Sequence, residues 1–131
     1  MGRTILAVFL AIVVAGLIVA AIEAIGHALH PLPPGIDVNN PEAMKNLIAS
    51  LPQSALVIVV MAWALGSIAG GFTAAKVSRQ HKRGAALAFG IAMVLLIAMN
   101  FIAIPHPVWM IVFGVVLPVP LALVGRKLAA I

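Results

Sequence analysis

Residues 5–24 read ILAVFLAIVVAGLIVAAIEA, an apolar run in which Glu23 is the only polar side chain. This run has the roughly 17–25 residues that an α-helix needs to cross about 30 Å of hydrocarbon. Backbone groups in lipid must be hydrogen-bonded within the segment, and no polar alternation suggests a barrel, so the run is predicted to be a membrane helix. Three further stretches show the same pattern: 55–75, 85–104 and 108–124.

The composition also indicates lipid, rather than water, as the main solvent. The 131 residues are 64% hydrophobic and 8% charged, whereas about a quarter of the residues in a soluble domain are charged. Little sequence lies outside the apolar stretches, which leaves no room for a separate soluble domain. We therefore expect one transmembrane domain over residues 1–131, with the lipid bilayer as its main partner.

The basic residues lie on one side of the predicted membrane. Seven of the eight Lys and Arg residues precede the first apolar stretch, separate the second from the third, or follow the fourth, and only Lys45 lies on the other side. The acidic residues all lie toward the Lys45 side: Glu23, Asp37 and Glu42. The positive-inside rule then predicts a multi-pass protein of a bacterial inner (plasma) membrane with both termini in the cytoplasm. It also explains the net charge of +5 without a nucleic-acid partner.

Cap and turn residues divide the chain into five expected helices. The first should end at His30, because the helical conformation is disfavoured for a residue that precedes proline. Asn40 and Pro41 provide an N-cap and a first-turn proline for a surface helix. Pro118 and Pro120 should kink the last helix. The expected fold is an all-α integral membrane protein, a four-helix up-down bundle with a short extracytoplasmic surface helix that either packs or covers a site. The predicted helices span residues 4–29, 41–50 (surface), 52–77, 84–104 and 107–125.

One face of the second membrane helix consists of small residues: Gly66, Ser67, Gly70 and Gly71. Small residues let helices approach closely, so this face should be buried. The Gly66–Gly70 spacing also fits the GxxxG pattern of helix dimers. Packing within the chain and a homodimer both stay open.

A set of polar side chains is expected to converge near the outer face. Glu23 and His27 are one helical turn apart and share a face. Glu23 lies about 28 Å along the helix from residue 4, close to the outer boundary of the hydrocarbon. Asn100 and His106 reach a similar depth from the third helix and the turn that follows it. We also expect Gly16 and Ala20 to continue the Glu23 face inward as a packed surface.

Three interpretations of this polar set stay open. A carboxyl group and imidazoles can bind a cation or exchange protons, as in the relays of transporters. Alternatively, Glu23, His27 and His106, with His30 as a further candidate, could bind a divalent metal such as zinc, with Asn100 hydrogen-bonded to a ligand. The third interpretation is structural, with an ion pair at the interface and a histidine at a helix end.

These interpretations lead to three hypotheses about function. The leading one is a transporter- or channel-like protein with an outward-facing cation or proton site. The first alternative is an accessory or structural membrane subunit that packs through the glycine face of the second helix. The second alternative is a metal-binding membrane protein or metalloenzyme. An enzyme is disfavoured, because membrane hydroxylases and desaturases need many more histidines than the three on the outer side, and no catalytic residue is assigned.

Several fragments resemble a family of small four-helix proteins of the bacterial inner membrane that has no known activity. The fragments are Glu23 with Gly26-His27, the Pro33-Pro34-Gly35-Ile36-Asp37 connector, Ala62-Trp63 with the following glycines, and Ile104-Pro105-His106-Pro107-Val108-Trp109. The resemblance implies a fold and a location only. The chain is also similar to the small multidrug exporters, which have four helices and a glutamate in the first. Their glutamate lies near mid-membrane, however, and the one-sided basic charge here argues against an antiparallel dual-topology dimer.

Overall fold

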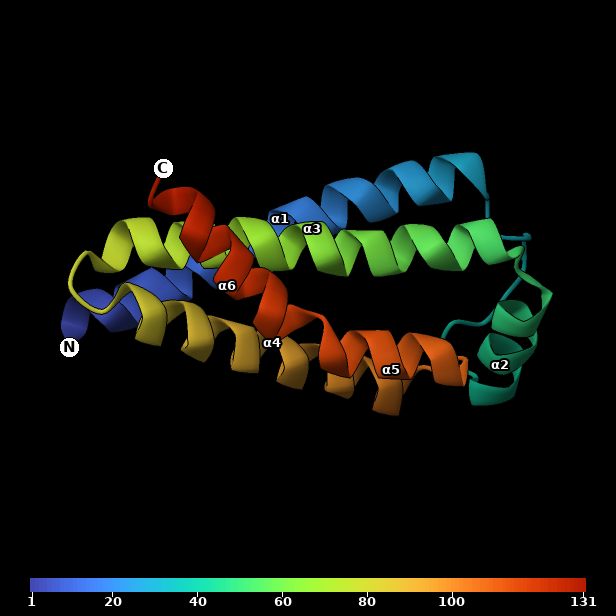
Figure 1. Cartoon of the computed structure of the whole chain (residues 1–131). Helices are drawn as coiled ribbons and strands as arrows, with labels where there is room; N and C mark the ends of the chain where they lie inside the picture. Colours follow the sequence, from blue (N-terminus) through green and yellow to red (C-terminus); the bar gives the residue numbers. More distant parts are fainter.

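The computed structural model describes residues 1–131 and contains six α-helices and no strand, which confirms the all-α prediction. The helices are α1 (Gly2–Leu29), α2 (Pro41–Ser50), α3 (Gln53–Ser78), α4 (Lys82–Ala103), α5 (Val108–Val116) and α6 (Pro118–Ala129). Both termini lie at one end of the elongated molecule and α2 lies at the other (Figure 1). We name these the basic end and the α2 end. Three helices, α1, α3 and α4, are long and apolar enough to cross a membrane, and α5 with α6 would make a fourth span.

The last apolar stretch forms two helices instead of the single helix expected over 107–125. The chain bends by 40° between α5 and α6, at Leu117. Pro118 has no N–H to donate, and its ring needs the space beside the carbonyl group of Gly114. The predicted kink is therefore present and is large enough to end one helix. Beyond it α6 crosses α3, whereas α5 lies along α4 (Figure 1).

The small-residue face of α3 is buried against other helices of the same chain. Gly66 packs against α1, where an added Cβ would be 3.0 Å from Val19, and Gly70 packs against the ring of Phe89 in α4. Gly71 lies on α6, where a Cβ would collide with the backbone of Ala122. Ser67 is also buried, its hydroxyl donating to the Trp63 carbonyl group at 2.7 Å. A homodimer through this face would have to displace three helices of the chain itself.

The buried face of α1 differs from the one expected. Ala7, Ala11 and Ala15 are buried and belong to the core. Gly16 and Ala20, expected to be packed, are exposed, and a Cβ added to Gly16 would meet no atom within 4 Å. The reason is that the alanines, four residues apart, let α1 lie close against α3, which turns the next residues outward.

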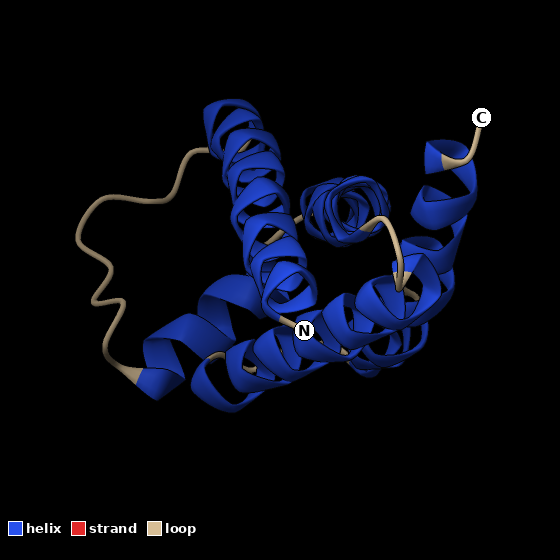
Figure 2. Ribbon diagram, turned by 90° about the vertical axis from the view of Figure 1, so that its left-hand side faces the viewer, coloured by secondary structure: helices blue, strands red, loops and turns tan.

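The helix α2 lies across the α2 end of the molecule, joined to α1 by a long loop (Figure 2). Its predicted cap is confirmed, because the Asn40 side-chain oxygen accepts from the amides of Glu42 and Ala43 at 3.0 and 3.3 Å. No Cα atom of α2 lies within 8 Å of a Cα atom of another helix. Side chains hold α2 in place instead, with Leu47 buried and Ile48 packed against the core.

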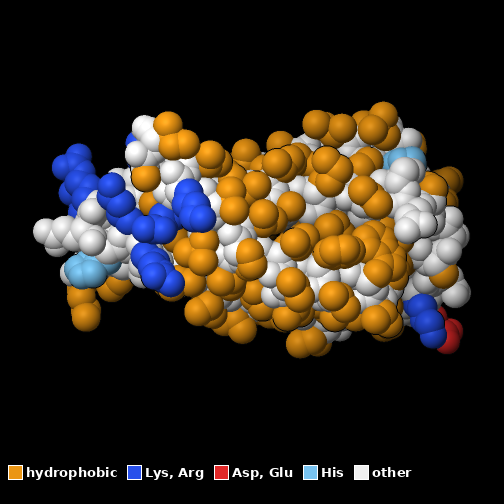
Figure 3. All heavy atoms as spheres, in the orientation of Figure 1, with side chains coloured by type: hydrophobic (Ala, Val, Ile, Leu, Met, Phe, Trp, Pro, Cys, Tyr) orange, Lys and Arg blue, Asp and Glu red, His pale blue; other side chains and the backbone are white.

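Charged side chains lie at the two ends of the molecule, with a broad apolar band between them (Figure 3). Seven basic residues belong to the ends of α1, α3, α4 and α6 and to the turn between α3 and α4, at the basic end. Lys45 and Glu42 lie on α2 at the opposite end. Large apolar side chains in the band are exposed, Phe9 by 61% and Leu95 by 60%. Such a surface is unusual for a protein surrounded by water.

Candidate functional site

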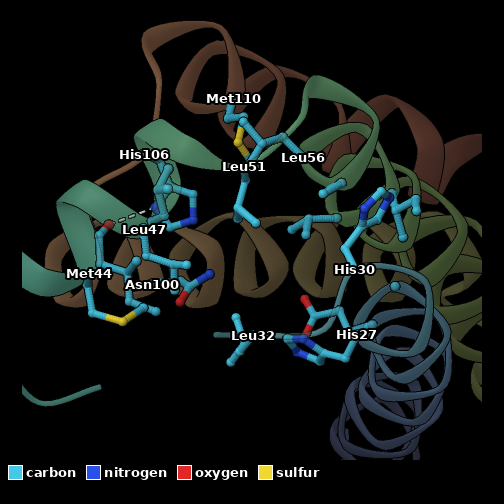
Figure 4. A pocket seen from close by; sticks show the side chains of 17 residues that line it. His27, His30, Leu32, Met44, Leu47, Leu51, Leu56, Asn100, His106 and Met110 are labelled. Atoms are coloured by element: carbon cyan, nitrogen blue, oxygen red, sulfur yellow. Dashed lines mark hydrogen bonds between the residues drawn. The ribbon is translucent and has the colours of Figure 1, made fainter. Parts of the chain in front are cut away.

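A cavity of about 240 Å³ lies at the α2 end, between α1, α2, α3 and the turn that joins α4 to α5 (Figure 4). Most of its lining is apolar, from α2 and α3 in particular. Its polar lining consists of Glu23, His27, His30, Asn100 and His106. The structure thus places around one cavity every residue that the sequence marked as a candidate for binding an ion, a proton or a metal.

The polar groups of the cavity stand on two facing walls (Figure 4). His27 and His30 project from α1 and its C-cap on one side, and Asn100 and His106 lie on the other. Leu51 projects between the walls. No side-chain hydrogen bond or ion pair joins the two walls, since the bonds of the cavity histidines run to groups on their own side. The space between the walls is therefore open to water or to a ligand.

The wall formed by α1 carries a carboxyl group without a hydrogen-bonding partner. Glu23 is half-buried, and none of the chain's side-chain hydrogen bonds or ion pairs involves it. His27 is exposed one turn further along. His30 ends the helix, its amide donating to the Gly26 carbonyl group at 2.8 Å, and its Nε2 lies 3.5 Å from the Ser54 hydroxyl. A half-buried carboxyl group in apolar surroundings favours a bound cation or proton.

On the opposite wall, the ring of His106 is oriented by its own turn. Nδ1 lies 2.7 Å from the Ile104 carbonyl oxygen, which can only accept, so Nδ1 carries the proton in this bond. The other ring nitrogen, Nε2, is turned toward the cavity (Figure 4). Burial lowers the pKa of His106, and the bond to Ile104 opposes that shift. The imidazole is therefore neutral at neutral pH, with an accepting lone pair on Nε2.

The imidazole of His106 also contacts two aromatic rings. The ring of Phe101 lies edge-on, with its centroid 5.0 Å from that of the imidazole, and the Trp63 ring is 6.1 Å away. Trp63 and Phe101 also contact each other edge-on, at 5.6 Å. Such ring contacts restrict the imidazole to one orientation. Sequence patterns did not single out Phe101, and its position next to Asn100 was the only available signal.

The set of residues predicted to bind a divalent metal is not assembled. No group of three or more His, Asp or Glu side chains is placed so that it could hold a metal ion. Glu23 and His27 belong to one wall of the cavity and His106 to the other. His30, the further candidate ligand, lies on the same wall as Glu23 and His27. The structure therefore gives no support to a zinc site.

Comparisons with protein-family models, with curated proteins and with solved structures find no match for this chain. The expected membership in a family of small bacterial inner-membrane proteins therefore stays a prediction. The cavity and its residues carry the functional inference by themselves.

Proposed function

We propose that the chain is a multi-pass protein of the inner membrane, crossed by α1, α3, α4 and the bent pair α5–α6 as a four-helix bundle. The apolar band of Figure 3 supports this, because lipid is the solvent in which exposed side chains such as Phe9 and Leu95 are favourable. The seven basic residues of the basic end support a cytoplasmic location for both termini. The α2 end then faces outward.

We propose further that this protein binds a small cation or relays protons at its outer face, as a transporter- or channel-like protein. The observation that carries the proposal is that one cavity is lined by one carboxyl group, three imidazoles and one carboxamide. A membrane helix rarely carries an ionisable residue without a role in binding or transfer. Here Glu23 has no hydrogen-bonding partner of its own, and His27, His30, Asn100 and His106 line the same cavity.

Each polar group has a distinct part in this proposal. Glu23 provides the negative charge that binds a cation, or the carboxyl group that takes a proton. His27 and His30 connect Glu23 to the outer surface, since His27 lies one turn beyond it on α1 and His30 is the C-cap of that helix. His106 offers the lone pair of Nε2, and Asn100 can donate or accept a hydrogen bond. Because α2 is held only by side chains, it can move aside to admit an ion.

The test is Glu23→Gln, compared with Glu42→Gln as a matched control on the exposed surface of α2. Both variants lose one carboxylate at the same end of the molecule, but only Glu23 lines the cavity. We expect proton or cation flux in proteoliposomes to fall about tenfold or more in Glu23→Gln and to stay unchanged in Glu42→Gln. Equal flux in the two variants, with equal thermal stability, would overturn the proposal.

The two alternatives have less support from the geometry. An accessory subunit that packs through Gly66, Ser67, Gly70 and Gly71 would need a face that α1, α4 and α6 already cover. A metal-binding protein or metalloenzyme would need three or more ligands close enough to share one ion, and the structure places no such group.

A further inference from the structure

A second hollow, of about 520 Å³, opens along the side of the molecule between α1 and α4. Seven of its ten lining residues are hydrophobic, from α1, α3 and α4. Ile12 and Val19 form one wall, Leu96 and Met99 the other, and Trp63 the floor. Met99 is 64% exposed, so this groove opens sideways and not only at the end. In the proposed membrane topology, that side faces the hydrocarbon of the lipid.

The groove and the cavity at the α2 end share two residues, Glu23 and Asn100. The two hollows therefore meet at a carboxyl group and a carboxamide. Beyond this pair the groove is apolar, and on the other side the cavity carries the three histidines. A ligand that filled both hollows would need one polar part at Glu23 and one apolar part along α1.

The charge around the junction determines what kind of polar part fits. Glu23 makes no ion pair, and seven of the eight Lys and Arg residues lie at the opposite end of the molecule. The nearest basic group is His27, on the same helix. Asn100 can accept a hydrogen bond from an N–H group through its side-chain oxygen. A protonated amine complements this pair in charge and in hydrogen bonding.

We propose that the substrate is an amphipathic cation, with a protonated amine at Glu23 and Asn100 and one apolar chain in the groove between α1 and α4. This inference rests on the proposed function and names the substrate class of the same site. The chain of the ligand comes from the outer leaflet of the bilayer, through the open side of the groove. The amine then reaches the cavity beneath α2 without crossing the apolar band.

Gly16 allows the groove to be blocked without disturbing the core. It lines the groove, and a Cβ added there meets no atom within 4 Å. Gly16→Leu therefore fills groove space and leaves Glu23 and the outer cavity as they are. Gly84→Leu is the matched control, since Gly84 also has open space around it but lies near the start of α4 at the basic end.

The probe is a dodecylammonium ion with a terminal bromine, because bromine quenches the fluorescence of a nearby indole. In nanodiscs of the Trp109→Phe protein, Trp63 is the one remaining tryptophan, and it lines the groove. We expect the probe to quench Trp63, and to bind about tenfold more weakly in Gly16→Leu and in Glu23→Gln. Gly84→Leu should bind it as the parent protein does.

Ethylammonium, which has almost no chain, separates this inference from the proposed function. Calorimetry should show that its binding depends on Glu23 and is unaffected by Gly16→Leu. If ethylammonium behaves so but Gly16→Leu leaves the long probe unaffected, the groove inference is overturned and the outer site stands. If neither cation binds, the inference about the substrate is overturned, and the proposed function is decided by the flux comparison of Glu23→Gln with Glu42→Gln. Quenching that persists in Glu23→Gln would show that the groove holds any lipid chain instead. A change of oligomer size in Gly16→Leu, measured by light scattering, would show that a second copy of the chain occupies it.

Discussion

The two ends of the molecule are packed in different ways. Toward the basic end, α3 meets α6 so closely that a Cβ at Gly71 or Gly125 would collide with backbone atoms, and Phe89 of α4 is fully buried against Gly70. Toward the α2 end, α2 has no Cα atom near those of another helix, side chains hold it in place, and a cavity remains. Within the apolar segments, the polar side chains that make no hydrogen bond also lie in this looser half. Close packing and the candidate site therefore occupy different halves of one structure.

The side chains of α3 explain this difference. Residues 66–75, GSIAGGFTAA, are mostly small and let α4 and α6 approach the backbone of α3. Residues 55–61, ALVIVVM, are mostly bulky, and four of them line the cavity at the α2 end. The helix α3 thus contributes small residues to a close contact at the basic end and bulky residues to the cavity lining at the α2 end.

The largest expected effect comes from Gly71→Leu, which would force α3 and α6 apart. We expect it to lower the free energy of unfolding by about 3 kcal/mol or more, because the obstacle is backbone and cannot rotate away. Thermal unfolding followed by circular dichroism in detergent measures this. Gly84→Leu, where a side chain has room, should unfold like the unmodified protein. Equal losses in the two variants would contradict the difference in packing.

The next effect compares one buried side chain from each half. Phe89→Ala should cost about 3–5 kcal/mol, because its cavity would lie between helices that cannot collapse further. Leu47→Ala should cost about 2 kcal/mol, because Leu47 belongs to a helix that can shift to close the gap. The two unfolding midpoints, measured in the same detergent, decide this. If Leu47→Ala proved as costly as Phe89→Ala, the α2 end would be as tightly packed as the basic end.

A smaller effect should stay within α2. Asn40→Ala removes the acceptor for two backbone amides, a loss of about 1 kcal/mol. Since α2 is held only by side chains, amide hydrogen exchange should rise in residues 41–50 and remain unchanged in α3 and α4. A uniform rise along the chain would instead mean that α2 unfolds together with the rest.

The smallest effect concerns the pH dependence of stability at the α2 end. The pKa of His106 is lowered by burial, so its folded form resists protonation. This contribution to stability is complete above the ordinary imidazole pKa of about 6.5, and is lost as the pH falls through the lowered pKa of His106. The melting temperature of the unmodified protein should therefore fall more between about pH 7 and about pH 5 than that of His106→Gln. His81→Gln, in the turn between α3 and α4, should keep the original slope.

Much of the fold could be predicted from the sequence because its signals are local. The apolar run that contains Glu23 predicted α1, Asn40 and Pro41 predicted the start of α2, and Pro118 predicted the bend. The size of that bend was not predictable, since it depends on how α6 finds its place across α3. The prediction that Gly16 and Ala20 are packed was wrong, because helical spacing alone does not say which face of α1 meets a neighbour.

For the candidate site, the sequence determined which polar groups exist and at what height along their helices they lie, since a helix rises by a fixed length per residue. That was enough to predict that Glu23, His27, Asn100 and His106 lie at a similar depth. Only the tertiary structure decided that they face each other across a gap and that the gap continues into an apolar groove. Those facts depend on how each helix is rotated about its axis, which is fixed by contacts between helices, such as those of Ala7, Ala11 and Ala15 in the core, and not by any residue alone.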